Sequence, residues 1–173
     1  MPMKLSEYDP AWEDAFGDEA WRIAETFGEH ALRVEHVGST AVPGLCAKPV
    51  IDIQVSLASL QPLEPLIGMM ASLGYSHLPL PDPPVEVYPF FHRPERWPTT
   101  HHLHLCEFAG EEEERHLAFR DWLRAHPADR DRYGELKLRL AQDVDENDVV
   151  SMFRYTEAKG DFVREIERKA RSG

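Results

Sequence analysis

The segment EHVGSTAVPGLCAKPVIDIQVSL, residues 35–57, contains the pattern that decides the fold of this chain. It reads as the end of one strand, a turn at Gly38 and Ser39, a loop rich in proline and small residues, and a second strand over 50–57. The second strand is β-branched and almost uninterrupted, which is typical of a strand buried on much of its surface. Asp52 interrupts it. Because burying an unpaired carboxylate is costly, Asp52 is expected to have a partner or a function.

Apolar periodicity predicts the elements on either side of this segment. Steps of three and four residues predict helices over 10–28 and 63–73 and three C-terminal helices, over 111–126, 133–144 and 162–170. Alternation predicts strands over 32–37 and 100–108. The proline-rich stretch 76–100 predicts one edge strand around 85–91 and a mobile loop around 93–98. The order predicts an α+β fold, with a mixed sheet covered by helices and a C-terminal helical segment, in a single domain over 1–173.

Charge and composition limit the classes of partner. The chain has 173 residues, enough for one domain with a sizeable core, and 42% of them are hydrophobic. Its net charge is −12, from 31 acidic and 19 basic residues. An acidic surface repels polyanions, so nucleic acid is not expected as the principal partner. A small anionic ligand in a local basic pocket remains compatible with this charge.

The sequence shows neither a disulfide pattern nor a targeting segment. The two cysteines, Cys46 and Cys106, show no paired spacing and predict no disulfide framework. The N-terminus lacks a basic start followed by an apolar core, and no run of about 18 apolar residues occurs. We therefore expect a cytoplasmic protein without a membrane partner. The sequence leaves the oligomeric state open.

The Gly-Ser turn and Asp52 are candidates for one site. If the two strands are neighbours, Ser39 and Asp52 lie at the same end of the sheet. A glycine admits a phosphate closely, hydroxyl and amide groups can bind it, and a carboxylate can hold a divalent cation. The alternative is a tight turn beside an aspartate that caps a local group. Lys48 could bind phosphate, or it could pair with Asp52 or Glu35.

Histidines form the second candidate group. HHLHL presents His102 and His104 on one strand face, where they could chelate a metal together with a carboxylate from the neighbouring strand. Alternating histidines also occur on solvated sheets, and a register shift of one residue would exchange this pair for His101 and Leu103.

Two further charged segments have open interpretations. Arg93, Arg96 and Trp97 could clamp a ligand's phosphate and base, or form an exposed loop edge. The run EEEER, residues 111–115, is predicted to be a solvated helix start.

Several segments together resemble a known family. In order they are EHVGSTAVPGLCAKPVIDIQVSL, HHLHL, FRDWLRAHP, YGELKLRLA and YTEAKGDFV, and they resemble the GrpB family from about Tyr8 to Ile166. That family is similar to the nucleotidyltransferase superfamily, so the resemblance implies a DNA polymerase β-like fold. Its pattern is a Gly-Ser turn followed by an acidic-apolar-acidic strand, in which the acids hold Mg²⁺.

Carried onto this sequence, the resemblance implies specific roles. Asp52 and Ser39 would be catalytic, and a nucleotide or related phosphorylated ligand would contact Gly38, Ser39, Thr40, Lys48, Tyr155 and Lys159. The last two would lie across the cleft in the YTEAK helix motif. Helix packing and a surface charge are the alternative for them. GrpB-like domains fused to dephospho-coenzyme A kinase suggest a nucleotide or coenzyme context.

The sequence departs from the superfamily pattern at the metal site. Gln54 occupies the second acidic position, and His102 or His104 occupies the place of the third. An amide and imidazoles suit two Mg²⁺ ions poorly and a single transition metal better, so the expected metal is Mg²⁺ or Mn²⁺, or Zn²⁺ given the histidines.

Three functional hypotheses follow from these residues. The first is a nucleotidyltransferase-like protein with a divalent metal on Asp52, His102 and His104. The second is a noncatalytic nucleotide-binding or regulatory module with a degenerate metal site. The third is a single-metal hydrolase that uses the same three residues. The sequence does not decide whether the protein is an enzyme.

Overall fold

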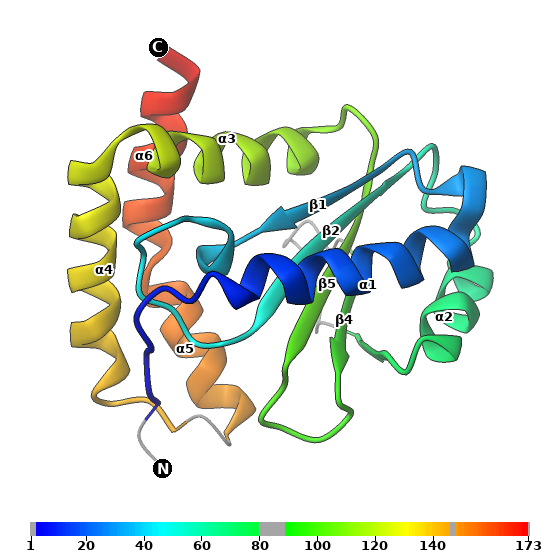
Figure 1. The fold of residues 1–173 in the computed structure, drawn as a ribbon, viewed down its shortest axis with the longest axis horizontal. Coiled ribbons are helices and arrows are strands. Elements are labelled where there is room, and N and C mark those ends of the chain that lie inside the picture. Colours follow the sequence, from blue (N-terminus) through cyan, green and yellow to red (C-terminus); the bar gives the residue numbers. More distant parts are fainter. Residues whose placement is uncertain (1–2, 80–88, 146–147, 173) are drawn as a thin grey trace.

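A five-stranded sheet lies at the centre of the protein, in a computed structural model that describes residues 3–79, 89–145 and 148–172 (Figure 1). The strands are β1 (Arg33–Val37), β2 (Ile51–Leu57), β3 (Ser76–Leu78), β4 (Phe90–Arg93) and β5 (His101–Glu107), in the spatial order β1-β2-β5-β4-β3. β2 and β5 are parallel and the other pairs are antiparallel. The predicted α+β fold with a mixed sheet is therefore confirmed.

Helices cover the sheet and extend beyond it. α1 (Ala11–Phe27) crosses in front of the strands in Figure 1, and α2 (Leu63–Ser72) follows β2. The C-terminal segment contains α3 (Glu111–Ala125), α4 (Pro127–Ala141), α5 (Val149–Ala158) and α6 (Gly160–Ser172). Short 3₁₀ helices occupy Gly28–His30 and Ser39–Ala41. In the described part of the chain, no helix is both long enough and apolar enough to cross a membrane.

Two elements were missed by the sequence-based prediction. The described C-terminal residues form four helices where apolar periodicity predicted three, because none of the predicted ranges covers α5; α4 also begins at Pro127, six residues before the predicted start. The start of α5 has a recognisable signal, since the carboxylate of Asp148 caps it by accepting hydrogen bonds from the backbone N–H groups of Val150 and Ser151. β3 has only three residues, too few for alternation to reveal it. Of the edge strand predicted around 85–91, residues 85–88 lie outside the described residues, and β4 begins at Phe90.

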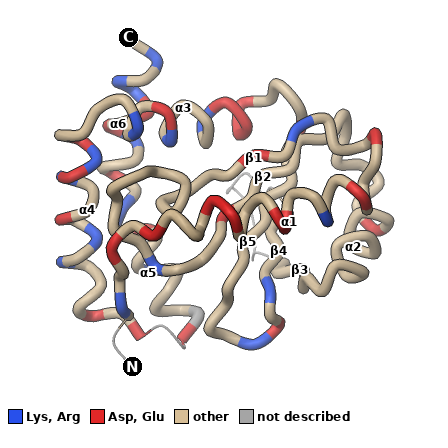
Figure 2. Tube along the Cα trace, in the orientation of Figure 1, with Lys and Arg blue, Asp and Glu red and all other residues tan. Residues whose placement is uncertain are grey.

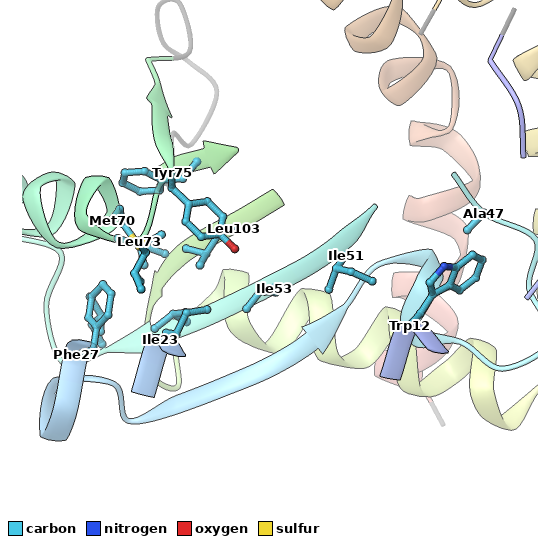
Figure 3. Close-up of a cluster of buried hydrophobic side chains, with 14 residues drawn as sticks. Trp12, Ile23, Phe27, Ala47, Ile51, Ile53, Met70, Leu73, Tyr75 and Leu103 are labelled. Carbon is cyan, nitrogen blue, oxygen red and sulfur yellow. The ribbon is translucent and has the colours of Figure 1, made fainter. Parts of the chain in front are cut away.

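The alternation of β2 separates an apolar face from a polar one. Ile51, Ile53 and Val55 belong to the main core, where they pack with side chains of α1, α2 and β5 (Figure 3). Successive strand residues point to opposite faces, so Asp52 and Gln54 project from the other side. Asp52 therefore does not interrupt the apolar core at all. It begins a polar row on the opposite face of a strand that is covered on both sides.

The start of α3 is not the solvated segment that was predicted. Glu111 and Glu114 are exposed, but Glu112 and Glu113 are buried. Glu113 accepts hydrogen bonds of 2.6 Å from both the Ser56 hydroxyl and the Ala109 backbone N–H. This prediction was wrong for the two middle glutamates, because the first turn of α3 packs against the polar face of the sheet.

Candidate functional site

A pocket of about 380 Å³ opens on the polar face of the sheet, bounded by β2, β5, the Gly-Ser turn, α4 and α5. Almost all of the residues predicted as functional meet there. The predicted residues that line it are Ser39, Thr40, Lys48, Asp52, His102, His104, Tyr155 and Lys159. The pocket thus unites segments that lie far apart in the sequence.

Gly38 holds the carboxylate of Asp52 in place. The register pairs Val37 with Asp52, so the Gly-Ser turn begins directly beside this residue. Gly38 has φ +71° and ψ −168°, a conformation that is essentially restricted to glycine. A Cβ atom at this position would lie 2.5 Å from Oδ2 of Asp52. Glycine is therefore required here both by the backbone and by the close approach of the carboxylate.

The two hydroxyl residues after Gly38 have different environments. Thr40 is 1% exposed, and its hydroxyl donates to the carbonyl of Val50 at 3.1 Å. The same oxygen lies 3.0 Å from Nε2 of His36, and burial lowers the pKa of that imidazole to about 4, so neutral His36 donates to it. Thr40 thus uses its hydroxyl to hold the turn. Ser39, by contrast, is partly exposed at the pocket wall.

Asp52 and His102 form a directly paired unit. They are opposite each other in the parallel register, and Oδ1 of Asp52 lies 3.3 Å from Nδ1 of His102. The other ring nitrogen, Nε2, lies 2.7 Å from the hydroxyl of Thr99. Burial would raise the pKa of Asp52, but the hydrogen bond and charge of His102, with further help from His104 and Lys159, outweigh it and hold the pKa below its usual value. Asp52 is therefore ionised at neutral pH.

His104 and Gln54 lie opposite each other two residues further along β5 and β2. Gln54 is fully buried and its Oε1 lies 2.7 Å from Nδ1 of His116, whose Nε2 lies 3.0 Å from Glu112. Burial, and then the neighbouring His116, lower the pKa of His104 to about 3, so this imidazole is neutral. Sequence reasoning missed His116 and Glu112, although their spacing of four residues on one helix was a usable signal.

The predicted metal ligands do not form a ready-made metal site. Asp52 and His102 contact each other, whereas His104 packs edge-on against His116 with ring centroids 5.3 Å apart. Across residues 3–79, 89–145 and 148–172, no three His, Cys, Asp or Glu side chains are grouped so that they could hold a metal ion. The donor set does not fit a three-ligand site, and metal binding stays a prediction.

Two lysines of the C-terminal helical segment line the same pocket as Asp52. Lys137, which sequence reasoning missed, is 2% exposed, and its ammonium group donates to the carbonyl of Cys46. Burial and the neighbouring Lys159 lower its pKa to about 7. Burial also lowers the pKa of Lys159 to about 8, against the opposing effect of Asp52. The signal for Lys137 was its position four residues after Tyr133, within an apolar helix stripe.

Tyr155 combines the two roles that were considered for it. It is 6% exposed and packs in a small core with Met3 and Val144, yet it also lines the pocket. The ammonium group of Lys159 lies 4.2 Å from the centre of its ring. Tyr155 thus orients the lysine at the pocket wall.

The proline-rich loop contributes only one of its three candidates. Trp97 lines the pocket, with Nζ of Lys48 5.4 Å from its ring centre. Arg93 neither clamps a ligand nor forms an exposed edge, because it makes an ion pair of 3.0 Å with buried Glu19 of α1. Arg96 is exposed. Of the two alternatives considered for these residues, the exposed edge fits Arg96, whereas Arg93 fits neither alternative, because β4 directs it toward α1.

Comparison with known proteins identifies the family. A family model described as GrpB protein matches residues 2–169. The chain belongs to the GrpB family. A UPF0157 protein of Halalkalibacterium halodurans is 41% identical over 167 residues, covering 96% of this GrpB chain and 81% of that relative. A crystal structure of conserved protein GrpB from Enterococcus faecalis has a TM-score of 0.81 and 34% sequence identity, with 96% of each chain covered.

Other relatives of this GrpB protein are longer. A dephospho-CoA kinase of Mycolicibacterium paratuberculosis is 31% identical over 193 residues, covering 98% of this chain but only 46% of the kinase. The GrpB chain thus spans about half the length of that relative. The more specific prediction of a DNA polymerase β-like nucleotidyltransferase fold goes beyond these likenesses and stays a prediction.

Proposed function

We propose that this GrpB protein binds a nucleotide or a related small phosphorylated ligand in the pocket beside Asp52. The observation that carries the proposal is the distribution of lysine. The sequence contains five lysines, at positions 4, 48, 137, 159 and 169, and three of them line this pocket. The chain as a whole has a net charge of −12, and its acidic residues are spread along α1, α3 and α4 (Figure 2). A local group of cations on an acidic protein favours an anionic ligand.

Buried Lys137 and partly buried Lys159 are electrostatically incomplete without an anion. Burial disfavours the charged form of Lys137 and Lys159, and Asp52 is the carboxylate that opposes this effect on both. A phosphate group beside these ammonium groups would supply compensating charge and accept their hydrogen bonds. Ser39, a partly exposed residue whose hydroxyl also contacts Tyr133, adds a hydroxyl group at the same wall. These contacts support phosphate as the anionic group.

The remaining wall of the pocket suits an apolar or aromatic part of the ligand. Phe90, Trp97 and Phe153 line it, and Phe153 is 41% exposed. Aromatic side chains stack against flat rings such as nucleobases. Ligand pockets range from about 300 to 1,000 Å³, so this pocket suits a small ligand. The relatives named dephospho-CoA kinase contain a GrpB-like half, which supports a nucleotide or coenzyme as the ligand.

Binding is better supported than metal-dependent transfer. A two-metal mechanism requires a second carboxylate, but Gln54 is a buried amide whose oxygen faces His116. The single-metal hydrolase hypothesis needs Asp52, His102 and His104 on one ion, an arrangement that the geometry described above does not favour. We therefore propose a ligand-binding protein and derive no chemical step through a metal.

The test is thermal stabilisation of the purified protein by ATP, CTP, GTP, UTP and coenzyme A, each with EDTA or with Mg²⁺, Mn²⁺ or Zn²⁺. A ligand at 100 times its Kd stabilises a protein by about 2.7 kcal/mol, a shift that is easily measured. We expect stabilisation by at least one of these compounds, and its loss in Lys137→Met and Lys159→Met. Lys4→Met is the matched control, because Lys4 is exposed and outside the pocket. The absence of any shift in the wild type would reject the proposal.

A further inference from the structure

We propose that Asp52 forms a hydroxyl-recognition subsite, in which its carboxylate accepts a hydrogen bond from a hydroxyl group of the phosphorylated ligand. The pocket would then select phosphorylated compounds that carry a free hydroxyl, such as ribonucleotides, over equivalents that lack it. This inference rests on the proposed function, because it assigns a second contact to the same ligand. It gives Asp52 a role that needs no metal.

The first support is that the carboxylate is fixed while retaining free acceptor capacity. Oδ2 lies in the space that a Cβ atom of Gly38 would need, 2.5 Å from that position, and Oδ1 faces Nδ1 of His102 at 3.3 Å. A carboxylate offers about four lone-pair positions, so one contact with an imidazole leaves others available. The Asp52 side chain is 27% exposed and lines the pocket. A ligand can therefore reach an acceptor whose position is already determined.

The second support is that neighbouring side chains fix the imidazole of His102 in position. The hydroxyl of Thr99, a residue that is 4% exposed, lies 2.7 Å from Nε2 of His102. Phe90 and Trp97 pack edge-on against the same imidazole, with ring centroids 5.1 and 5.7 Å away. The chain Thr99–His102–Asp52 thus aligns the carboxylate before a ligand arrives, which reduces the entropy lost on binding.

The third support is the charge of the surroundings, which selects the kind of group that Asp52 can bind. An ionised carboxylate accepts hydrogen bonds and repels phosphate, so it must contact another part of the ligand. Besides the N–H groups of a base, which would lie at the aromatic wall of the pocket, the donors on a phosphorylated metabolite are chiefly ammonium and hydroxyl groups. Lys137 and Lys159 share the pocket and would repel an ammonium group. A neutral hydroxyl is the donor that suits both Asp52 and the lysines.

The experiment compares ATP, CTP, GTP and UTP with their 2′,3′-dideoxy counterparts by isothermal titration calorimetry in EDTA. A hydrogen bond to a charged group corresponds to a preference of about 10- to 100-fold. We expect the wild type to prefer at least one hydroxylated compound by this factor. We expect Asp52→Ala to bind both members of the pair equally, and Asp52→Asn, whose amide oxygen still accepts a neutral hydrogen bond, to retain only a reduced preference. Glu107→Gln is the control, since this exposed carboxylate lies on β5 outside the pocket and should leave the preference intact.

Thr99→Val tests the positioning of Asp52 independently, because it leaves the pocket wall unchanged. Thr99 is not among the pocket-lining residues, so this variant should still bind the dideoxy compounds with wild-type affinity while its preference for hydroxyl falls several-fold. Circular dichroism confirms that each variant is folded.

The outcomes separate the two proposals. Equal binding of both members by the wild type overturns the hydroxyl subsite and leaves the proposed function standing, whereas no binding of any compound overturns both. A preference that is absent in EDTA and appears only with added Mg²⁺ or Mn²⁺ overturns the subsite in favour of Asp52 as a metal ligand.

Discussion

Replacing Gly38 with alanine tests the geometry on which the pocket depends. Gly38 has φ +71°, and a Cβ atom would lie 2.5 Å from Oδ2 and 2.9 Å from Cγ of Asp52. The backbone conformation alone costs about 1–3 kcal/mol for a residue with a side chain. Asp52 must also move away from His102, which removes an interaction worth about 1–2 kcal/mol. Alanine lowers the entropy of the unfolded chain and returns about 0.4–1 kcal/mol. We expect the free energy of unfolding to fall by about 1–5 kcal/mol.

Two other glycines provide matched controls for this substitution. Gly28 has φ +53° with open space around its Cβ position, so Gly28→Ala measures backbone strain without a clash. Gly17 lies inside α1, also in open space, and Gly17→Ala should stabilise the helix by about 0.5–1 kcal/mol. Urea unfolding followed by circular dichroism gives all three values. We expect Gly38→Ala to be at least about 1 kcal/mol less stable than Gly28→Ala.

The same variants test the link between this turn and ligand binding. Gly38→Ala should also lose binding of whichever compound stabilises the wild type, because the displaced carboxylate enters the pocket, whereas Gly28→Ala should retain it. If Gly38→Ala and Gly28→Ala prove equally stable and bind equally well, the reasoning that Gly38 positions Asp52 is refuted.

Three further predictions concern other parts of the molecule. Burial lowers the pKa of Lys137 to about 7, so above this pH the unfolded chain binds more protons than the folded protein, and the stability rises between about pH 7 and 10. The urea midpoints at pH 7 and pH 9.5 should therefore differ more in the wild type than in Lys137→Met. Parallel pH profiles of the two proteins would contradict this. Glu113→Gln should destabilise the protein by about 1–3 kcal/mol, because Glu113 is buried with three partners, whereas its exposed neighbour Glu114→Gln should change stability by less than about 0.5 kcal/mol. Phe153→Ala should weaken the binding of an aromatic ligand several-fold with little loss of stability, whereas Val150→Ala on the same helix should leave binding unchanged. Equal affinities of Phe153→Ala and the wild type by calorimetry would exclude stacking on Phe153.

Local patterns in the sequence predicted most elements of the fold. The helix over 10–28 and the strand over 50–57 were correct to within one residue at each end, since an apolar stripe and a β-branched run are signals carried by neighbouring residues. β3 escaped because three residues carry no period. The burial of Glu113 escaped for another reason, since its partners Ser56 and Arg33 lie on strands far away in the sequence.

Some residues of the candidate site could be predicted from the sequence, and others were placed only by the tertiary structure. The alternation of the sequence placed His102 and His104 on one strand face, and it placed Ser39 near Asp52 on the condition that their strands are neighbours. The structure meets that condition, because β1 pairs with β2, and the register of β2 with β5 decides that the face with His102 and His104 lines the pocket. Only the tertiary structure brought Lys137 into the pocket with Asp52, directed Arg93 away toward Glu19, and gave Gln54 its contact with His116. These outcomes depend on how helices pack on the sheet, and packing joins residues whose separation along the chain carries no local signal.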